Sequence, residues 1–215
     1  MWYKVKRIMM RPNGVEKQVR PDTWWKPWAN TVMYYPFTTD QLDKVGSSSL
    51  SWTWTKETLG YTFAANEYIY VNNPSTSCRF ISCWVKFNSS LWIYSQSPST
   101  YVWQILYNFQ HTSSSYNKKF QIEQSYNQWG LSNAQNTSSW VWYHLAMGYD
   151  GSKVCCYINW NKVWEATSGV YSPWTMMLWR YINETLSEFI WESVCWTDQE
   201  VLDYFNQTKS LYGIS

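Results

Sequence analysis

Short apolar runs alternate with polar turns along most of the chain, starting near Val32. The runs are rich in aromatic and β-branched residues, and the segments between them are rich in Ser, Asn and Gly. Strands at this spacing, without helical periodicity between them, predict an antiparallel β-sandwich or β-barrel. The runs span residues 61–71, 78–87, 91–95, 101–109, 118–124, 140–149, 153–159, 162–166 and 186–196.

Two adjacent cysteines, Cys155 and Cys156, lie in one of these runs. Successive side chains of a strand point to opposite faces of its sheet. Cys156 therefore belongs with the apolar face that includes Leu145 and Met147, and Cys155 belongs with the other face. On a regular strand the two thiols cannot hold one metal ion together, so we expect both to be small buried side chains.

One helix is predicted, near the end of the chain. In "WTDQEVLDYF", residues 196–205, Thr197 and Glu200 have the spacing of a capping box. Val201 and Phe205 follow at the spacing of a helical apolar stripe.

Residues 1–31 are predicted to be a separate N-terminal unit. The turn "RPNG" between two strand-like segments indicates a β-hairpin, and prolines then break "RPDTWWKPWANT" into an extended arm. Tryptophans in such an arm are costly to leave in water, so we expect it to dock on a partner or on the main domain, residues 32–215. The candidate docking residues are Arg20, Trp24, Trp25 and Trp28.

Composition narrows the possible partners. Eighteen tryptophans and eighteen tyrosines raise the aromatic content to 20%, whereas charged residues make up 15% and the net charge is +2. This balance supports a packed core and argues against nucleic acid as a partner. No apolar run reaches the ~18 residues of a membrane helix, so no membrane insertion is expected. No apolar signal segment is visible, which predicts folding in a cytosol with all five cysteines reduced.

Four segments, in order, resemble the concanavalin A-like lectin and glucanase family in its laminin-G-like form. "YYPFTTDQLDKVGSSSLSWTWTKETLGYTFAANEYIYV" is similar to the family's opening, and "CRFISCWVKF" is similar to its S-F-W-V-K strand. "WVWYHLAMGYDGSKVCCYINWNKV" resembles W-x-H-V-A-V-T-Y-D-G followed by L-Y-V-N-G-K, and "LSEFIWESVCWTDQEVLDYF" resembles the last strand with its helix. The resemblance covers residues 32–212. It implies an all-β, two-sheet antiparallel jelly-roll sandwich with one short C-terminal helix, a fold found in bacterial and phage proteins of many functions.

The resemblance does not extend to catalysis. Glucanases of this family carry their acids in a Glu-x-Asp-x-Glu run on one strand, and this chain has no such run. The nearest acids, Glu188 and Glu192, have Ile190 between them on the same face, so we expect no enzyme activity. His144 matches a structural position of the family. Some relatives bind calcium through loop acids, but no metal or other cofactor is predicted here.

Aromatic side chains near turns are the candidate ligand contacts. The family's hairpin tip is Asn-Gly, because positive φ is needed there, and Trp160 stands where the resemblance places Gly. We expect this tryptophan to be exposed and to bind a ligand together with Asn159 and Tyr157. A second candidate is the loop "SYNQWG", with Tyr126 and Trp129, and the third is the run "SLWIYSQ", with Trp92 and Tyr94.

These observations favour a non-enzymatic, lectin-like structural component of a phage particle, in a tail, an appendage or a capsid decoration. Its expected partners are other virion proteins, reached through the N-terminal arm, and a host-surface polysaccharide. It would be assembled in the host cytoplasm and act in the virion. The sequence leaves open whether the chain forms a homo-oligomer. The first alternative is a purely structural virion protein whose aromatics make protein–protein contacts, and the second is a glycan hydrolase.

Overall fold

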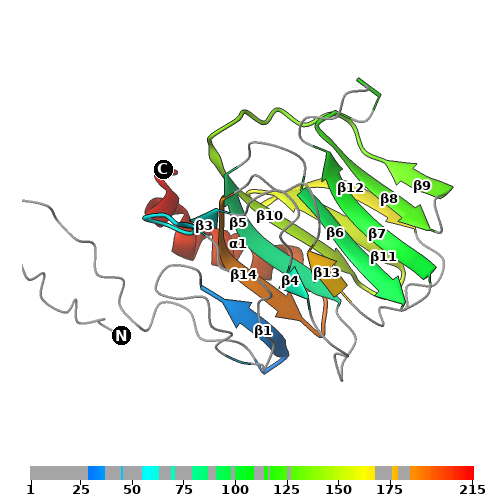
Figure 1. The fold of residues 1–215 in the computed structure, drawn as a ribbon, viewed down its shortest axis with the longest axis horizontal. Helices are drawn as coiled ribbons and strands as arrows, with labels where there is room; N and C mark the ends of the chain where they lie inside the picture. The colour runs from blue at the N-terminus through cyan, green and yellow to red at the C-terminus, as the bar shows by residue number, and fades with distance from the viewer. Residues whose placement is uncertain are drawn as a thin grey trace, which may run out of the picture.

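The computed structural model contains two antiparallel β-sheets and a C-terminal helix (Figure 1). None of the helices in the described ranges is long and apolar enough to cross a membrane. The residues that the structure describes are 29–36, 45, 55–62, 69–70, 79–86, 91–97, 100–108, 114–115, 117–124, 127–167, 176–178 and 185–215.

Sheet A has eight strands in the order β12-β11-β10-β5-β14-β3-β2, and β1 also pairs with β14. Lys86, the last residue of β5, is aligned with the first residues of β10 and β14, Trp142 and Thr185. We call this end of the strands the Lys86 end of sheet A. The strands are β1 (Thr31–Tyr35), β2 (Thr55–Lys56), β3 (Tyr61–Thr62), β5 (Phe80–Lys86), β10 (Trp142–Tyr149), β11 (Lys153–Ile158), β12 (Asn161–Thr167) and β14 (Thr185–Glu192).

Sheet B has six strands in the order β4-β13-β6-β7-β8-β9 and lies across sheet A (Figure 1). Its strands are β4 (Ile69–Tyr70), β6 (Leu91–Ser97), β7 (Thr100–Asn108), β8 (Lys119–Gln124), β9 (Asn127–Leu131) and β13 (Met176–Leu178). With sheet A it forms the predicted all-β sandwich.

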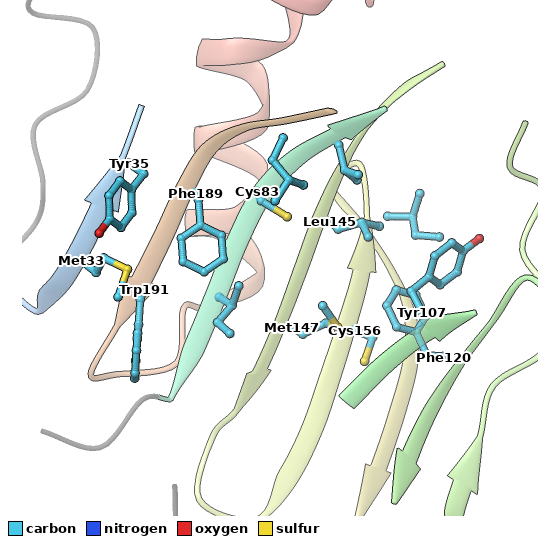
Figure 2. Packing of buried hydrophobic residues seen from close by; sticks show 14 of the residues in the cluster. Met33, Tyr35, Cys83, Tyr107, Phe120, Leu145, Met147, Cys156, Phe189 and Trp191 are labelled. Atoms are coloured by element: carbon cyan, nitrogen blue, oxygen red, sulfur yellow. The ribbon is translucent and has the colours of Figure 1, made fainter. Parts of the chain in front are cut away.

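The main core lies between the two sheets (Figure 2). Tyr107 and Phe120 enter it from sheet B, and their ring centroids are 4.7 Å apart. Leu145, Met147 and Cys156 enter it from sheet A, on the face that strand alternation predicts. Burial of large aromatic and aliphatic side chains here removes apolar surface from water on both sheets.

A second core lies on the other face of sheet A, beneath the helix α1 (Asp198–Thr208) and the 3-10 helix η1 (Lys209–Tyr212). The indole of Trp84 stacks on Tyr212, with ring centroids 4.1 Å apart, and Cys155 is buried in the same cluster. The predicted capping box is present, because Thr197 and Glu200 each bond the other's backbone. The C-terminal helix therefore forms a third layer over sheet A.

Several of the strand predictions are wrong. The run 61–71 contains β3 and β4, which belong to different sheets, and the run 186–196 leaves strand geometry after Glu192. "SYNQWG" was expected to be an aromatic and polar loop, yet residues 127–131 form β9. A Cβ on Gly130 would lie 2.8 Å from the indole of Trp164 on β12, so any larger residue there would displace that indole.

The N-terminal unit lies almost entirely outside the described residues. Its hairpin and its docking residues Arg20, Trp24, Trp25 and Trp28 belong to the part of the chain that the structure does not describe. The described chain reaches back to Ala29, and the backbone oxygen of Asn30 accepts a 2.9 Å bond from the backbone nitrogen of Ser193. The boundary between residues 1–31 and 32–215 stays a prediction.

Candidate functional site

A two-residue turn joins β11 to β12 at the Lys86 end of sheet A. Ile158 and Asn161 are paired across it, which leaves Asn159 and Trp160 at its tip. Asn159 donates its backbone N–H to the carbonyl of His144 at 2.7 Å, and its side-chain oxygen accepts the backbone N–H of His144 at 3.0 Å. These two bonds tie the turn to the neighbouring strand β10.

The side chain of Trp160 is 47% exposed at the tip of this turn, which confirms the predicted exposure. The positive φ that the family's glycine implied for position 160 is not found there. Asn159, not Trp160, has the positive φ, at 46°. Asparagine tolerates this left-handed region better than other side chains with a Cβ. The tryptophan therefore occupies the second position of the turn without positive φ.

Tyr157 lies in a different environment from its neighbours Asn159 and Trp160. It is buried in the core beneath α1, and its hydroxyl donates a 2.7 Å bond to the carboxylate of Asp198 at the start of that helix. Lys162 pairs with the same carboxylate at 2.9 Å and lowers the pKa of Asp198. Burial raises the pKa of Tyr157 well above its ordinary value. The ring anchors the helix and is not placed to touch a ligand.

The remaining candidate residues are on sheet B or outside the described chain. Trp92 and Tyr94 lie two positions apart on β6, and Trp129 lies on β9; the structure describes only the backbone of these strands at those positions. Strands β7 and β8 separate β6 from β9. Tyr126 lies outside the described residues. The described residues therefore place none of these side chains beside Trp160.

The two acids of β14 hold strand β1 in place. Glu188 accepts a 2.5 Å bond from the hydroxyl of Tyr34, and Glu192 accepts a 2.6 Å bond from the hydroxyl of Thr31. Both carboxylates are almost completely buried, and Glu188 takes a positive φ of 50° at an irregularity in the β14–β5 pairing. Their partners are the side chains of an adjacent strand.

His144 is a buried member of the second core. Its Nε2 is 2.7 Å from the hydroxyl of Ser82, and its ring lies 5.5 Å from Trp84 between centroids. Burial lowers the pKa of His144 to about 3, so the imidazole is neutral at pH 7.

One acid lies in the turn between β10 and β11. The carboxylate of Asp150 accepts the backbone N–H groups of Ser152 and Lys153, each at 2.8 Å. These bonds lower the pKa of Asp150 and close the turn that contains Gly151. Within the described ranges, no group of three His, Cys, Asp or Glu side chains is arranged to hold a metal ion.

Sequence inspection missed a second exposed tryptophan. Trp140 was assigned to the run 140–149, but β10 begins at Trp142, and Trp140 is 63% exposed in the loop before it. The neighbouring Val141 is 45% exposed. The polar stretch "SNAQNTSS" immediately before Trp140 was the available signal that the strand had not yet begun.

The fold and the exposed tryptophans define a two-sheet β-sandwich that presents aromatic side chains on loops at one end of a sheet. No protein-family model matches this chain, and no curated protein matches it. Solved β-sandwich domains do resemble it.

One is domain 4 of AbnA, a GH43 extracellular arabinanase from Geobacillus stearothermophilus, in complex with arabinotriose. The TM-score is 0.57 at 17% identity, over 81% of this chain and 98% of that domain. Another is the receptor-binding domain of a botulinum neurotoxin C/D mosaic serotype, with a TM-score of 0.60 at 10% identity over 82% of this chain and 51% of that one. The binding domain of botulinum neurotoxin DC in complex with SialylT has a TM-score of 0.58 at 11% identity, over 83% and 51%. The chain spans about half the length of the two toxin domains. At these identities the likeness establishes the fold alone.

Proposed function

We propose that this chain is a non-enzymatic carbohydrate-binding domain in which the ring of Trp160 stacks on a sugar. The observation that carries the proposal is the exposed indole of Trp160 on a turn fixed by the bonds between Asn159 and His144. Sugars present flat C–H faces that pack on aromatic rings, and a fixed ring loses little entropy when a ligand binds.

Two further observations support binding rather than hydrolysis. Solved domains of the same fold are in complexes with arabinotriose and with SialylT. The acids of β14, Glu188 and Glu192, are buried against Tyr34 and Thr31. Retaining glycosidases instead need two carboxyl groups about 5–5.5 Å apart facing the substrate.

Binding of glycans by the full chain, measured with a glycan array and then by calorimetry, tests the proposal. Trp160→Ala is expected to weaken binding by about tenfold or more, or about 1.4 kcal/mol, and Trp160→Tyr is expected to keep much of it. The control is Val194→Ala. Val194 is 43% exposed just after β14 ends, at the opposite end of sheet A from Lys86.

Unchanged glycan binding by Trp160→Ala would remove this residue from the site. No binding to any glycan would favour the alternative in which the aromatics make protein–protein contacts. Release of reducing sugar from a polysaccharide would contradict the non-enzymatic proposal.

The finer part of the proposal places the domain on a phage particle, docked through residues 1–31. Its support is the sequence of the arm, with three tryptophans in a proline-containing segment. Mass spectrometry of purified phage particles whose genome encodes this chain is expected to detect the chain among their proteins. A chain lacking residues 1–28 is expected to fold and yet be missing from the particles, and normal incorporation of that chain would contradict docking.

A further inference from the structure

A second exposed tryptophan lies at the same end of sheet A as the turn of Trp160. Trp140 and Val141 are neighbours in the loop Ser132–Val141, which joins β9 of sheet B to β10 of sheet A, and both are exposed. Leaving a large apolar surface in water forfeits the free energy that its burial would contribute. An adjacent pair of such side chains therefore marks a contact surface better than a single one.

This loop is fixed to both sheets. The backbone of Ser132 is bonded to Phe120 of β8 at 2.9 Å, and the buried hydroxyl of Thr137 is 2.6 Å from the hydroxyl of Tyr107 on β7. At its other end, the backbone N–H of Ser138 donates to the hydroxyl of Tyr143 on β10 at 3.0 Å. The loop can therefore present Trp140 with little loss of entropy on binding.

The backbone of Trp140 is itself unusual. Its φ is 62°, in the left-handed region that bulky side chains rarely adopt. A residue held there costs on the order of 1–3 kcal/mol, and such residues cluster at binding and catalytic sites. Glycine would adopt this conformation without that cost. The tryptophan at this position is therefore unfavourable for the folded state, which is consistent with a role in binding.

Trp140 and Trp160 lie at the same end of sheet A. The turn of Trp160 is bonded to His144, and Trp140 comes four residues before His144 on the chain. Trp140 lies in the turn before β10 and Trp160 lies at the tip of the neighbouring hairpin, so the two indoles are presented by different loops. A ligand that reaches both loops is expected to be longer than one sugar ring.

Three lysines that border this end of the sheet, within the described part of the chain, are already engaged. Lys86 pairs with Glu57 at 2.8 Å, Lys162 pairs with Asp198 at 2.9 Å, and Lys118 donates to the backbone carbonyl of Thr137. Apart from Lys162, the exposed polar residues of the loop before Trp140 and of the turn of Trp160 are uncharged; they are Asn133, Asn136, Ser138, Ser139 and Asn161. Amides and hydroxyls bond sugar hydroxyls, whereas carboxylated sugars favour a free cation.

From these observations we infer that Trp140 and Trp160 are two platforms of one site for an extended, uncharged oligosaccharide of several sugar units. The inference rests on the proposed carbohydrate-binding function and adds its substrate class. One platform holds one sugar, and the other holds a sugar further along the same chain, while the loop amides and hydroxyls bond the hydroxyl groups between them.

Calorimetric titration of the full chain tests the inference with two series of probes. The first series contains neutral arabinan, xylan, cellulose and mannan oligosaccharides, from single sugars to hexamers. The second contains sialylated and uronate oligosaccharides of the same lengths. We expect affinity to rise with the length of a neutral chain and to depend little on salt. Trp140→Ala and Trp160→Ala are each expected to weaken binding of the longer chains by about tenfold, and Val194→Ala serves as the control.

Trp140→Gly separates binding from folding. It relieves the left-handed strain, so its thermal midpoint is expected to stay at or above that of the wild type while long-chain binding falls as in Trp140→Ala. Loss of binding in a well-folded Trp140→Gly chain cannot then be attributed to unfolding.

Several results would overturn the inference. Tighter, salt-dependent binding of anionic glycans would contradict an uncharged ligand and leave the proposed function intact. Wild-type binding by Trp140→Ala, together with loss in Trp160→Ala, would contradict the second platform alone. Absence of binding to every glycan would overturn the proposed function as well. Self-association that Trp140→Ala abolishes, without glycan binding, would assign the two indoles to an interface between copies of this chain.

Discussion

At the scale of single residues, burial changes the acid–base chemistry of Glu192. Its side chain is fully buried, and this burial raises its pKa from 4.5 to about 7, against the lowering effect of the hydrogen bond from Thr31. In the unfolded chain the carboxyl has its ordinary pKa. Between these two values the folded protein keeps a proton that the unfolded chain releases, so the free energy of unfolding falls as the pH rises.

Chemical denaturation between pH 4.5 and pH 8 measures this effect. The contribution of Glu192 is fully present below pH 4.5 and is lost as the pH rises through 7. The shift corresponds to a loss of about 2–3 kcal/mol. Glu192→Gln keeps a neutral acceptor for Thr31, so the variant is expected to be more stable than the wild type at pH 8 and similar at pH 4.5. If the free energies of unfolding of the two proteins changed with pH in parallel, Glu192 would ionise in the folded protein at its ordinary pKa.

The candidate site shows how far single residues could be predicted. The exposure of Trp160 follows from its place in a turn, which is local information, and it is confirmed. The positive φ of Trp140 is set by where the loop Ser132–Val141 is tied to both sheets. No local pattern in "SSWVWY" distinguishes that tryptophan from the two-residue alternation of the strand that follows.

At the scale of elements, the N-terminus of α1 supports the second core. The side chain of Thr197 accepts the backbone N–H of Glu200 at 3.3 Å, and the Glu200 carboxylate accepts the backbone N–H of Thr197 at 2.7 Å. Thr197→Ala removes one of these bonds and is expected to lower the free energy of unfolding by about 1 kcal/mol. Urea denaturation checks this.

Gln207→Ala, at an exposed position of the same helix, is the matched control and is expected to change stability by less than about 0.5 kcal/mol. An equal effect of both substitutions would mean that the capping box adds nothing beyond helix propensity.

Elements with local signals were predicted best. The hairpin of β10 and β11 has clear alternation and an Asp-Gly turn, and α1 has its capping box. Both are confirmed. The wrong assignments concern β9 and the split between β3 and β4. Gly130 lowers the strand propensity of β9, but the contact with Trp164 on β12 requires it. The split depends on which sheet each strand joins, and that is decided by partners far away along the chain.

At the scale of the whole molecule, the three layers imply different roles for the two ends of the chain. Removing residues 197–215 would expose the second core, including Trp84 and Ile190, to water. That truncated chain is expected to be insoluble or to lack a cooperative thermal transition. Removing residues 1–28 leaves every described contact in place, and its thermal midpoint is expected to match that of the full chain.

Circular dichroism melting curves of the two truncated chains and the full chain make this comparison. A cooperative transition in the chain without α1 would show that the two sheets fold without their third layer. A large loss of stability on removal of residues 1–28 would contradict the predicted boundary between the N-terminal unit and the sandwich.

The adjacent thiols Cys155 and Cys156 face different layers, one beneath α1 and the other between the sheets. Neither forms a disulfide. Partial unfolding that lifts only the helix would make Cys155 reactive toward an alkylating reagent, whereas Cys156 would react only when the sheets separate. The alkylation rates of these two consecutive residues would therefore report separately on the opening of the two interfaces in the same molecule.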